Sequence, residues 1–303
     1  MALITEYNRK NGLDHLVTQY DLKACYHPSL PLVILNYNRT ANKNSPYTNT
    51  CRGLILELDT WNPIAQGMTR FFDIKPDEIV PTSAEIKEDG TLIHMFNYQG
   101  SWLLATRHNF ADDYVNDRTL TYQQLFEKIS ERPVGELGLS LNPKVTYCLE
   151  MCSKDNRIIR KYQPGVIYLL TCYQQGIELS EKEVDTEAAK IGWKRPNRYL
   201  VNTLEQCQLL LAEESLKDPL FEGLVIKDKE GRRYKKKNRF YLDIHKLKYR
   251  GWKVALPKLV VPLLLHHSDK LDLIYEAISS GHDINIDVDL NIIRQYWTQN
   301  IQR

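Results

Sequence analysis

Residues 84–93 read Ala84-Glu85-Ile86-Lys87-Glu88-Asp89-Gly90-Thr91-Leu92-Ile93, and the interpretation of the whole chain starts from them. Apolar and β-prone residues flank a short polar centre, a pattern that predicts a strand, a tight turn and a second strand. Lys87 stands at the mouth of the turn, and Gly90 is expected to supply the bend. An amine at a strand end, with its stem against apolar walls, can lose its proton near neutral pH and act as a nucleophile. The alternative is a surface hairpin with a solvated Lys-Glu-Asp face.

Composition restricts the classes of protein that 303 residues of this sequence can form. A hydrophobic share of 43% and an aromatic share of 10% are typical of a globular protein rather than a disordered one. The formal net charge of +2 gives no global signal for nucleic acid, so any such binding must come from local basic patches. The length suffices for one large domain and a small one.

The cysteines and the apolar runs indicate a soluble protein of the cytoplasm. Six cysteines occur without a CxxC pair and without the spacing of a zinc site, so we expect reduced and mostly buried thiols. Glu6 and Arg9 near the N-terminus, with no long apolar core, argue against a signal peptide. The most apolar run, Val260 to Leu265, is too short to cross a bilayer.

Local patterns predict a mixture of helices and strands. Helices are expected at 13–20, 121–131, 181–191 and 204–216, and a polar loop at 38–49. Strands are expected at 32–36, 54–57, 102–107, 145–151 and 167–172, and a hairpin from 222–227 and 232–237. After about His245 the pattern of Leu and Ile predicts a tail of roughly four short helices.

Several residues have the chemistry for a reaction at a nucleotide phosphate. Such a reaction needs a nucleophile, cations for the phosphates, and carboxylates for a metal ion or ribose. Lys87 is the candidate nucleophile, and Glu150 and Glu222 are the candidate carboxylates. Cations at strand ends are Arg52, Arg70, Arg107, Lys235 and Lys237.

Strand periodicity brings some of these groups together. Lys235 and Lys237 are two residues apart, so both project from one face of a strand. A hairpin that turns at Glu230-Gly231 would place Lys237 opposite Leu224, with Glu222 diagonal to it and within reach. Cations gathered for phosphates would also surround Lys87 and favour its neutral form.

Each feature also has an ordinary structural explanation. The charge run 232–237 could be the solvated edge of a hairpin. Glu150 could be a buried carboxylate paired with Arg157 or Arg160. Arg70 could form a cation–π contact with the two phenylalanines that follow it.

The order of the pieces resembles the ATP-dependent RNA ligase 1 family of tailed phages, within the covalent nucleotidyltransferase superfamily of ligases and capping enzymes. The resemblance covers about residues 50–245. Lys-x-Asp-Gly at 87–90 is similar to the family's nucleophile motif. The family's Arg-Gly, basic-Phe-Phe and Gly-x-x-Phe-Lys-x-Lys-x-x-Trp-Tyr-x-x-x-His segments are similar to Cys51–Glu57, Arg70-Phe71-Phe72 and Gly231–His245.

This resemblance implies an α+β fold in which an adenylyltransferase (nucleotidyltransferase) domain, residues 1–245, has antiparallel sheets around a nucleotide cleft. A small all-helical C-terminal domain, residues 246–303, would follow. DNA ligases and capping enzymes share the core but append a β-barrel, whereas the tail here has a helical pattern. Such other covalent nucleotidyltransferases, and a non-catalytic RNA-binding module, are the alternatives.

The resemblance also implies a role for each site residue. Lys87 would attack the α-phosphate of ATP to give a lysyl-AMP intermediate, and Lys235 and Lys237 would stabilise the charge that develops there. Glu150 and Glu222 would hold Mg²⁺ or Mn²⁺. The nucleotide would be bound by Arg52, Arg70, Glu85, Ile86, Asp89, Gly90, Arg107, Glu150, Glu222, Lys235 and Lys237.

The implied partner is RNA with 5′-phosphate and 3′-hydroxyl ends, for example nicked tRNA under repair. AMP would pass from the enzyme to the 5′ end before the 3′-hydroxyl seals the strand. The enzyme is expected to be a monomer in the cytoplasm, or in the host cytoplasm if it is phage-encoded. Arg70 and Arg107 stand where the family tends to have lysine, and the residue that stacks on the base is open, with Tyr168 as a candidate.

Overall fold

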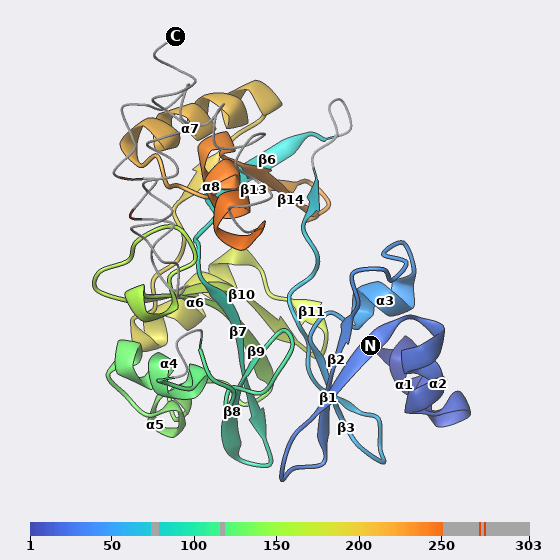
Figure 1. Cartoon of the computed structure of the whole chain (residues 1–303). Coiled ribbons are helices and arrows are strands. Elements are labelled where there is room, and N and C mark those ends of the chain that lie inside the picture. Colours follow the sequence, from blue (N-terminus) through green and yellow to red (C-terminus); the bar gives the residue numbers. More distant parts are fainter. Residues whose placement is uncertain (74–78, 116–118, 251–272, 274–275, 277–303) are drawn as a thin grey trace. The chain divides into compact units, whose positions relative to one another are not determined.

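The computed structural model describes residues 1–73, 79–115, 119–250, 273 and 276, and the chain forms two compact units (Figure 1). Unit 1 consists of Met1–Phe72, Gly90–Asp155 and Gln163–Asn197. Unit 2 consists of Asp73–Asp89, Asn156–Tyr162 and Arg198–Arg303. The chain therefore passes between the units several times, and one passage, from Asp89 to Gly90, lies within the segment that was expected to carry the nucleophile.

The first part of unit 1 is a four-stranded antiparallel sheet with three helices. The strands, in the order β1-β2-β3-β4, are β1 (Leu22–Tyr26), β2 (Leu32–Tyr37), β3 (Leu54–Glu57) and β4 (Pro63–Ala65). The helices are α1 (Ala2–Asn11), α2 (Leu13–Gln19) and α3 (Pro46–Thr50). The predicted helix at 13–20 and strands at 32–36 and 54–57 are confirmed. The polar loop predicted for 38–49 is wrong at its end, because Pro46 occupies the first turn of α3, where its fixed φ suits a helix.

The second part of unit 1 is a five-stranded sheet, also antiparallel, in the order β11-β10-β9-β7-β8. Its strands are β7 (Thr91–Tyr98), β8 (Ser101–Thr106), β9 (Val145–Cys152), β10 (Val166–Gln174) and β11 (Ile177–Glu178). The helices are α4 (Tyr122–Ser130), α5 (Val134–Gly138) and α6 (Glu181–Ile191), and a short 3-10 helix spans Lys154–Asn156. The predicted elements at 102–107, 121–131, 145–151, 167–172 and 181–191 are confirmed.

Strand alternation divides the side chains of unit 1 between two sides of each sheet. On β7, Ile93 and Met95 join a core that includes Leu125 and Phe126 of α4. Phe96, which follows Met95 and points to the opposite face of β7, joins a different core with residues of β2 and β3, so the two sheets pack face to face. The other face of the first sheet is covered by α1 and α2.

Unit 2 is built on a third sheet, in the order β12-β6-β13-β14-β5. Its strands are β5 (Phe72–Asp73), β6 (Pro81–Ile86), β12 (Arg198–Leu200), β13 (Gly223–Asp228) and β14 (Arg233–Lys237), and its helices are α7 (Leu204–Lys217) and α8 (Arg239–Arg250). Ala84, Ile86, Leu224 and Ile226 pack with α7 on one face of this sheet. The predicted helix at 204–216 is confirmed. The tail after His245 was predicted to be helical. Its first residues, up to Arg250, belong to α8 and lie within the main described range.

The segment from Lys87 to Gly90 joins two strands of different sheets. β6 pairs with β12 and β13, whereas β7 pairs with β8 and β9. The predicted strand, turn and strand are therefore confirmed, but the alternative of a surface hairpin is wrong. Each of the two strands has neighbours on both sides, which leaves no edge at which β6 and β7 could pair with each other.

The hairpin of β13 and β14 is confirmed, but its predicted register is wrong by one residue. Lys237 lies opposite Gly223 rather than Leu224. The Asp228 backbone N–H donates to the carbonyl oxygen of Arg232 at 3.2 Å, and Gly231 has a φ of +74°. This is a three-residue loop that ends on a left-handed glycine, whereas a two-residue turn was assumed.

The thiols agree with the sequence-based expectation. All six cysteines are free, and five of them are buried. Within the described residues, no helix has both the length and the apolar character needed to cross a membrane. Val260 to Leu265, the most apolar run, lie outside the described residues.

Candidate active site

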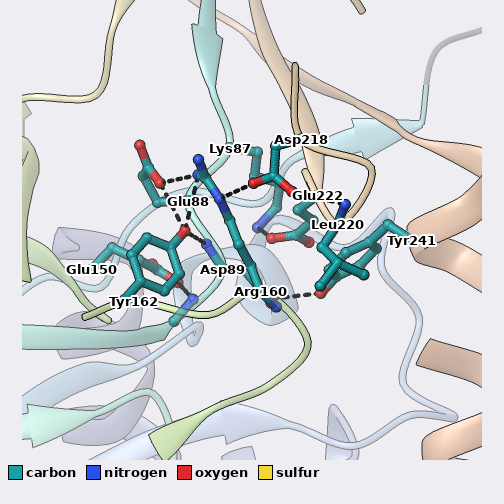
Figure 2. Close-up of polar contacts among 11 residues, drawn as sticks. Lys87, Glu88, Asp89, Glu150, Arg160, Tyr162, Asp218, Leu220, Glu222 and Tyr241 are labelled. Carbon is teal, nitrogen blue, oxygen red and sulfur yellow. Dashed lines mark hydrogen bonds and ion pairs between the residues drawn. The ribbon is translucent and has the colours of Figure 1, made fainter. Parts of the chain in front are cut away.

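The carboxylate of Glu222 bridges the amines of Lys87 and Lys237. Lys87 Nζ lies 2.9 Å from Oε2, and Lys237 Nζ lies 2.6 Å from Oε1; Figure 2 shows the Lys87 side of this arrangement. The Lys87 backbone N–H donates to the carbonyl oxygen of Gly223 at 2.8 Å, which continues the pairing of β6 with β13. The predicted convergence of Glu222 and Lys237 is thus confirmed, and Lys87 joins them.

Gly223 explains how Glu222 reaches the two lysines. Regular alternation would place Glu222 on the same face as Leu224, which packs with α7. Gly223 has a φ of +146°, and a Cβ built on it would lie 2.2 Å from the carbonyl oxygen of Lys236. Only glycine fits this conformation and this close approach, and the break in alternation turns Glu222 toward the lysines.

The electrostatics of Glu222 favour its ionised form. Burial raises the pKa of this carboxyl group, but the charges and hydrogen bonds of Lys87 and Lys237 lower it by more. The pKa of Glu222 therefore lies below its ordinary value. Lys237 Nζ also lies 5.3 Å from the centre of the Tyr241 ring, a cation–π distance. Glu222 therefore carries its charge at neutral pH between two cations.

Lys235 shares a face of β14 with Lys237 but has a different partner. Its Nζ lies 3.3 Å from Oδ1 of Asp73, whose side chain is 76% exposed. An ion pair this exposed contributes little to stability. Lys235 can therefore leave Asp73 and pair with another anion at little cost in stability.

Asp89 holds the turn that follows Lys87. One carboxylate oxygen accepts the backbone N–H groups of Ile159 and Arg160 at 2.8 and 2.7 Å, and the other accepts the Tyr241 hydroxyl. Its own backbone N–H donates to the hydroxyl oxygen of Tyr162 at 2.9 Å. Burial, followed by the charge of Glu222, raises the pKa of Asp89. The Asp89 carboxylate thus fixes the conformation of the turn through these hydrogen bonds, as expected.

Arg160 connects this turn to the segment before Glu222 (Figure 2). Nη1 donates to Glu88 Oε2 at 2.8 Å, and Nε donates to Asp218 Oδ2 at 2.7 Å. The Tyr162 hydroxyl donates to the same Glu88 oxygen at 2.8 Å. From the sequence, Arg160 was considered only as one of two possible partners of Glu150, and its pairing with Glu88 and Asp218 was not predicted. No periodicity or motif marked Arg160 or Tyr162, because they lie in a segment without regular structure.

A hydrogen bond between Gly90 and Glu150 holds the other end of the turn, within unit 1. The Gly90 backbone N–H donates to Glu150 Oε1 at 3.0 Å. A Cβ at Gly90 would lie 2.4 Å from the carbonyl oxygen of Met151 and 2.7 Å from Cys152 Sγ. Gly90 lies at a bend, as expected, and its close approach to β9 is a further reason for a glycine at this position. Arg157, the other suggested partner of Glu150, instead pairs with Glu276 at 3.2 Å.

Two arginines of unit 1 lie around a buried histidine. Arg52 donates through Nη1 to the carbonyl oxygen of Met68, whose backbone N–H donates to Nε2 of His94 at 3.4 Å. Burial, with the charges of Arg52 and Arg107, lowers the pKa of His94 to about 3. Burial and the charge of Arg52 also lower the pKa of Arg107. Two like charges held this close to a neutral imidazole favour a bound anion.

His108 is a further residue of this cluster that sequence reasoning missed. Its Nε2 lies 2.8 Å from Nη2 of Arg107, and its Nδ1 lies 2.8 Å from the side-chain nitrogen of Asn36. Burial and the charge of Arg107 lower the pKa of His108 to about 4, so the ring is neutral at pH 7. A neutral partner orients Arg107 without cancelling its charge.

The remaining predicted residues occupy more ordinary positions. Arg70 lies 5.9 Å above the ring of Phe72, as the cation–π alternative proposed. Glu85 is buried and forms an ion pair with Lys227 at 3.3 Å, and the Ile86 side chain packs in the core beside α7. Tyr168, the candidate for stacking, lies on β10 opposite Glu150.

No group of three or more His, Cys, Asp or Glu side chains within the described part of the chain is arranged to hold a metal ion. The available carboxylates are hard oxygen donors, which suit Mg²⁺. This ion is commonly held by one or two carboxylates, with phosphates and water as its other ligands. Glu150 of unit 1 and Glu222 of unit 2 each carry a donor of this kind.

Comparisons with known proteins show what the chain is similar to. Residues 50–249 match a protein-family model described as RNA ligase. A putative bifunctional polynucleotide kinase/RNA ligase of Autographa californica nuclear polyhedrosis virus is 27% identical over 271 residues, which is 81% of this chain but 38% of that protein. This chain thus spans well under half the length of that relative.

Solved structures support the fold. Form 2 of an archaeal ATP-dependent RNA ligase has a TM-score of 0.60 at 13% identity, covering 99% of this chain and 82% of that chain. A putative ATP-dependent DNA ligase from Aquifex aeolicus has a TM-score of 0.56 at 12% identity, covering 95% and 79%. At these identities the likeness shows the fold alone, and it confirms the predicted α+β fold of ligases with antiparallel sheets.

Proposed function

Because the chain belongs to the RNA ligase family, we propose that it is an ATP-dependent RNA ligase that joins 5′-phosphate and 3′-hydroxyl ends. The observation that carries this proposal is the cluster in which Glu222 bridges Lys87 and Lys237. It offers an amine at a strand end, a buried carboxylate and a second cation, which are the groups that transfer of a nucleotide through a lysine requires.

In the first step, the Lys87 amine attacks the α-phosphorus of ATP. The bond between the α- and β-phosphates breaks, pyrophosphate leaves, and lysyl-AMP remains. A carboxylate 2.9 Å away favours the ammonium form of a lysine, so Lys87 must leave Glu222 and lose its proton before it attacks. Mg²⁺ or Mn²⁺, held by Glu150 and Glu222, would neutralise charge on the phosphates.

The other cations have complementary roles. Lys237 and Lys235 stabilise the charge that develops at the α-phosphate. Among the described residues, the ion pair that Lys235 would give up is the one with the exposed carboxylate of Asp73. Arg52, Arg70 and Arg107 bind the triphosphate, and the repulsion between Arg52 and Arg107 is relieved when the anion is present.

The residues around the nucleophile shape the site. Asp89 and Gly90 fix the turn, and Gly90 presents its N–H to Glu150. Glu150 binds the ribose or the metal. Glu85 and Ile86 are the last residues of the strand that leads to Lys87.

In the later steps, AMP passes to the 5′-phosphate of the RNA, and the 3′-hydroxyl then displaces AMP and seals the strand. RNA is the expected partner, with nicked tRNA as the candidate substrate in repair. We further propose that residues 1–245 form the adenylyltransferase domain and residues 246–303 a helical C-terminal domain, with α8 joining them. The proposed enzyme is a monomer in the cytoplasm or host cytoplasm.

The first test is incubation with α-labelled ATP and Mg²⁺ without RNA, followed by denaturing electrophoresis. Wild-type protein should retain label, and Lys87→Ala, shown to be folded, should retain none. Label from GTP instead of ATP would favour a capping-type enzyme, and sealing of nicked DNA but not RNA would favour a DNA ligase. Absence of label from either nucleotide would support a non-catalytic RNA-binding module instead.

Lys237→Ala tests the role of the second lysine. We expect the rates of lysine adenylylation and of sealing of pre-adenylylated RNA each to fall by about 10²–10³-fold, because a charged donor to the reacting phosphate is lost in both. Exposed Lys217, which forms an ion pair with Glu214 of the same helix, provides the control as Lys217→Ala. Wild-type rates for Lys237→Ala in both assays would refute the phosphate role.

A further inference from the structure

The pairing between β6 and β13 ends at the nucleophile. The last backbone hydrogen bond of this pairing joins the Lys87 N–H to the Gly223 carbonyl oxygen, at 2.8 Å. Beyond it, the chain on one side continues into Glu88, and on the other side it comes from the turn that begins at Asp218. The backbone pairing of β6 with β13 therefore does not by itself fix the relative positions of the two segments that carry Lys87 and Glu222.

A single guanidinium joins the two segments at this point. Arg160 donates to Glu88, the neighbour of Lys87, at 2.8 Å and to Asp218 at 2.7 Å. Asp218 in turn organises the approach to Glu222, because its side chain accepts the N–H of Leu220 at 2.9 Å and its carbonyl accepts the N–H of Phe221 at 3.0 Å. Figure 2 shows Arg160 between the two carboxylates.

Further contacts hold both ends of the Arg160–Glu88 pair. Glu88 is buried, and its accepting oxygen also binds the Tyr162 hydroxyl. The Arg160 guanidinium lies 5.1 Å from the centre of the Tyr162 ring, and its own backbone N–H is bound by Asp89. Without the arginine, two carboxylates would face each other across the junction and repel.

We propose that Arg160 is a positioning residue that sets the separation of the Lys87 amine from the Glu222 carboxylate and so aligns Lys87 for attack on the α-phosphate. This inference rests on the proposed function. Arg160 touches neither the amine nor the Glu222 carboxylate in the described contacts, and it acts through Glu88 and Asp218. Charge-assisted hydrogen bonds from a planar guanidinium are suited to this task, because they fix direction as well as distance.

The steps of the reaction depend differently on this alignment. Lys87 is the nucleophile in adenylylation of the enzyme, but it forms no bond in the sealing of RNA that is already adenylylated. Misplacing a reacting group by about 1 Å costs on the order of 10²-fold in rate. Loss of Arg160 should therefore slow adenylylation by about 10- to 100-fold at saturating ATP, with the KM for ATP unchanged and sealing of pre-adenylylated RNA reduced by less than about 3-fold.

Arg195 provides a matched control. It also bridges two carboxylates, those of Glu181 and Asp185, at 2.7 Å each, and its side chain is 15% exposed compared with 25% for Arg160. Arg195→Gln should lower the melting temperature without changing the ratio of the two rates. Arg160→Gln should change that ratio, and Arg160→Lys, which keeps the charge but not the fork, should fall between it and the wild type.

A second readout does not need ligase activity. Limited acetylation with acetic anhydride, quantified by mass spectrometry, should modify Lys87 faster in Arg160→Gln than in the wild type, because the pair with Glu222 is less well held. Exposed Lys128 provides the reference lysine. Unchanged acetylation of Lys87, or equal loss of both rates as in a general folding defect, would overturn the proposal. Faster acetylation in a protein whose wild type takes no label from ATP would keep the positioning role and refute the ligase function.

Discussion

Replacing Glu222 with glutamine keeps the shape of a buried side chain but removes its charge. The two carboxylate oxygens lie 2.9 Å from Lys87 Nζ and 2.6 Å from Lys237 Nζ. An amide offers one oxygen and one nitrogen donor, so one of the two lysines would face a donor instead of an acceptor. Both ammonium groups would also lose the negative charge that lies between them.

The size of the effect follows from these contacts. A hydrogen bond to a charged group contributes about 1.5–3 kcal/mol, and breaking a buried ion pair costs about 3–5 kcal/mol. The Lys87 and Lys237 side chains are 20% and 24% exposed, so water replaces part of what is lost. We therefore expect Glu222→Gln to lower the free energy of unfolding by about 2–4 kcal/mol at pH 7.

The difference should depend on pH. The pKa of Glu222 in the folded protein lies below its ordinary value of 4.5. A carboxyl group with a lowered pKa contributes stability that is complete above its unfolded pKa and is lost as the pH falls through its folded pKa. The difference in the free energy of unfolding between the wild type and Glu222→Gln should thus be constant from pH 4.5 to neutral pH and become smaller at lower pH.

Urea titrations of the wild type, Glu222→Gln, Lys237→Met and the double variant would measure the effect. With the carboxylate gone, Lys237→Met removes one of two repelling charges, so it should cost less in the glutamine background than in the wild type. A loss below about 0.5 kcal/mol for Glu222→Gln, or an equal cost of Lys237→Met in both backgrounds, would refute the reasoning.

Two further predictions concern the supports of the site. Lys248 is buried and donates to the carbonyl oxygens of Arg157 and Ile158, and burial with the charge of Arg157 lowers its pKa from 10.5 to about 8. Since the unfolded chain then binds more protons, the wild type should gain stability relative to Lys248→Met between about pH 8 and 10, and a constant difference would contradict this. Gly90→Ala would place a Cβ 2.4 Å from the carbonyl oxygen of Met151 and should cost about 1–3 kcal/mol, whereas an unchanged melting temperature would show that β9 can give way.

Most local elements could be predicted from the sequence because their signals are local. α6 spans Glu181–Ile191 as predicted, with Ser180 and Glu183 forming a capping box and Gly192 closing the helix in a left-handed conformation. The candidate residues Lys87, Glu222 and Lys237 could also be found, because a motif places each of them at the end of a strand. For such features the neighbours in the chain supply the physical cause.

The register of the β13–β14 hairpin could not be predicted, because one backbone angle at Gly231 decides whether its loop has two residues or three. The turn of Glu222 toward the lysines likewise depends on the angle at Gly223 and on the carbonyl of Lys236 beside it. Neither angle is visible as a pattern of residue types.

The network around Lys87 depends on contacts between segments that are far apart in the chain. Glu88 meets Arg160 and Tyr162, and Arg160 meets Asp218. Residue type and spacing determined which lysine, carboxylates and cations are the candidates for the site, because these follow from the sequence itself. Folding determined which carboxylate each cation meets, because hydrogen bonds and ion pairs form only over a few ångströms and the approach of distant segments sets those distances.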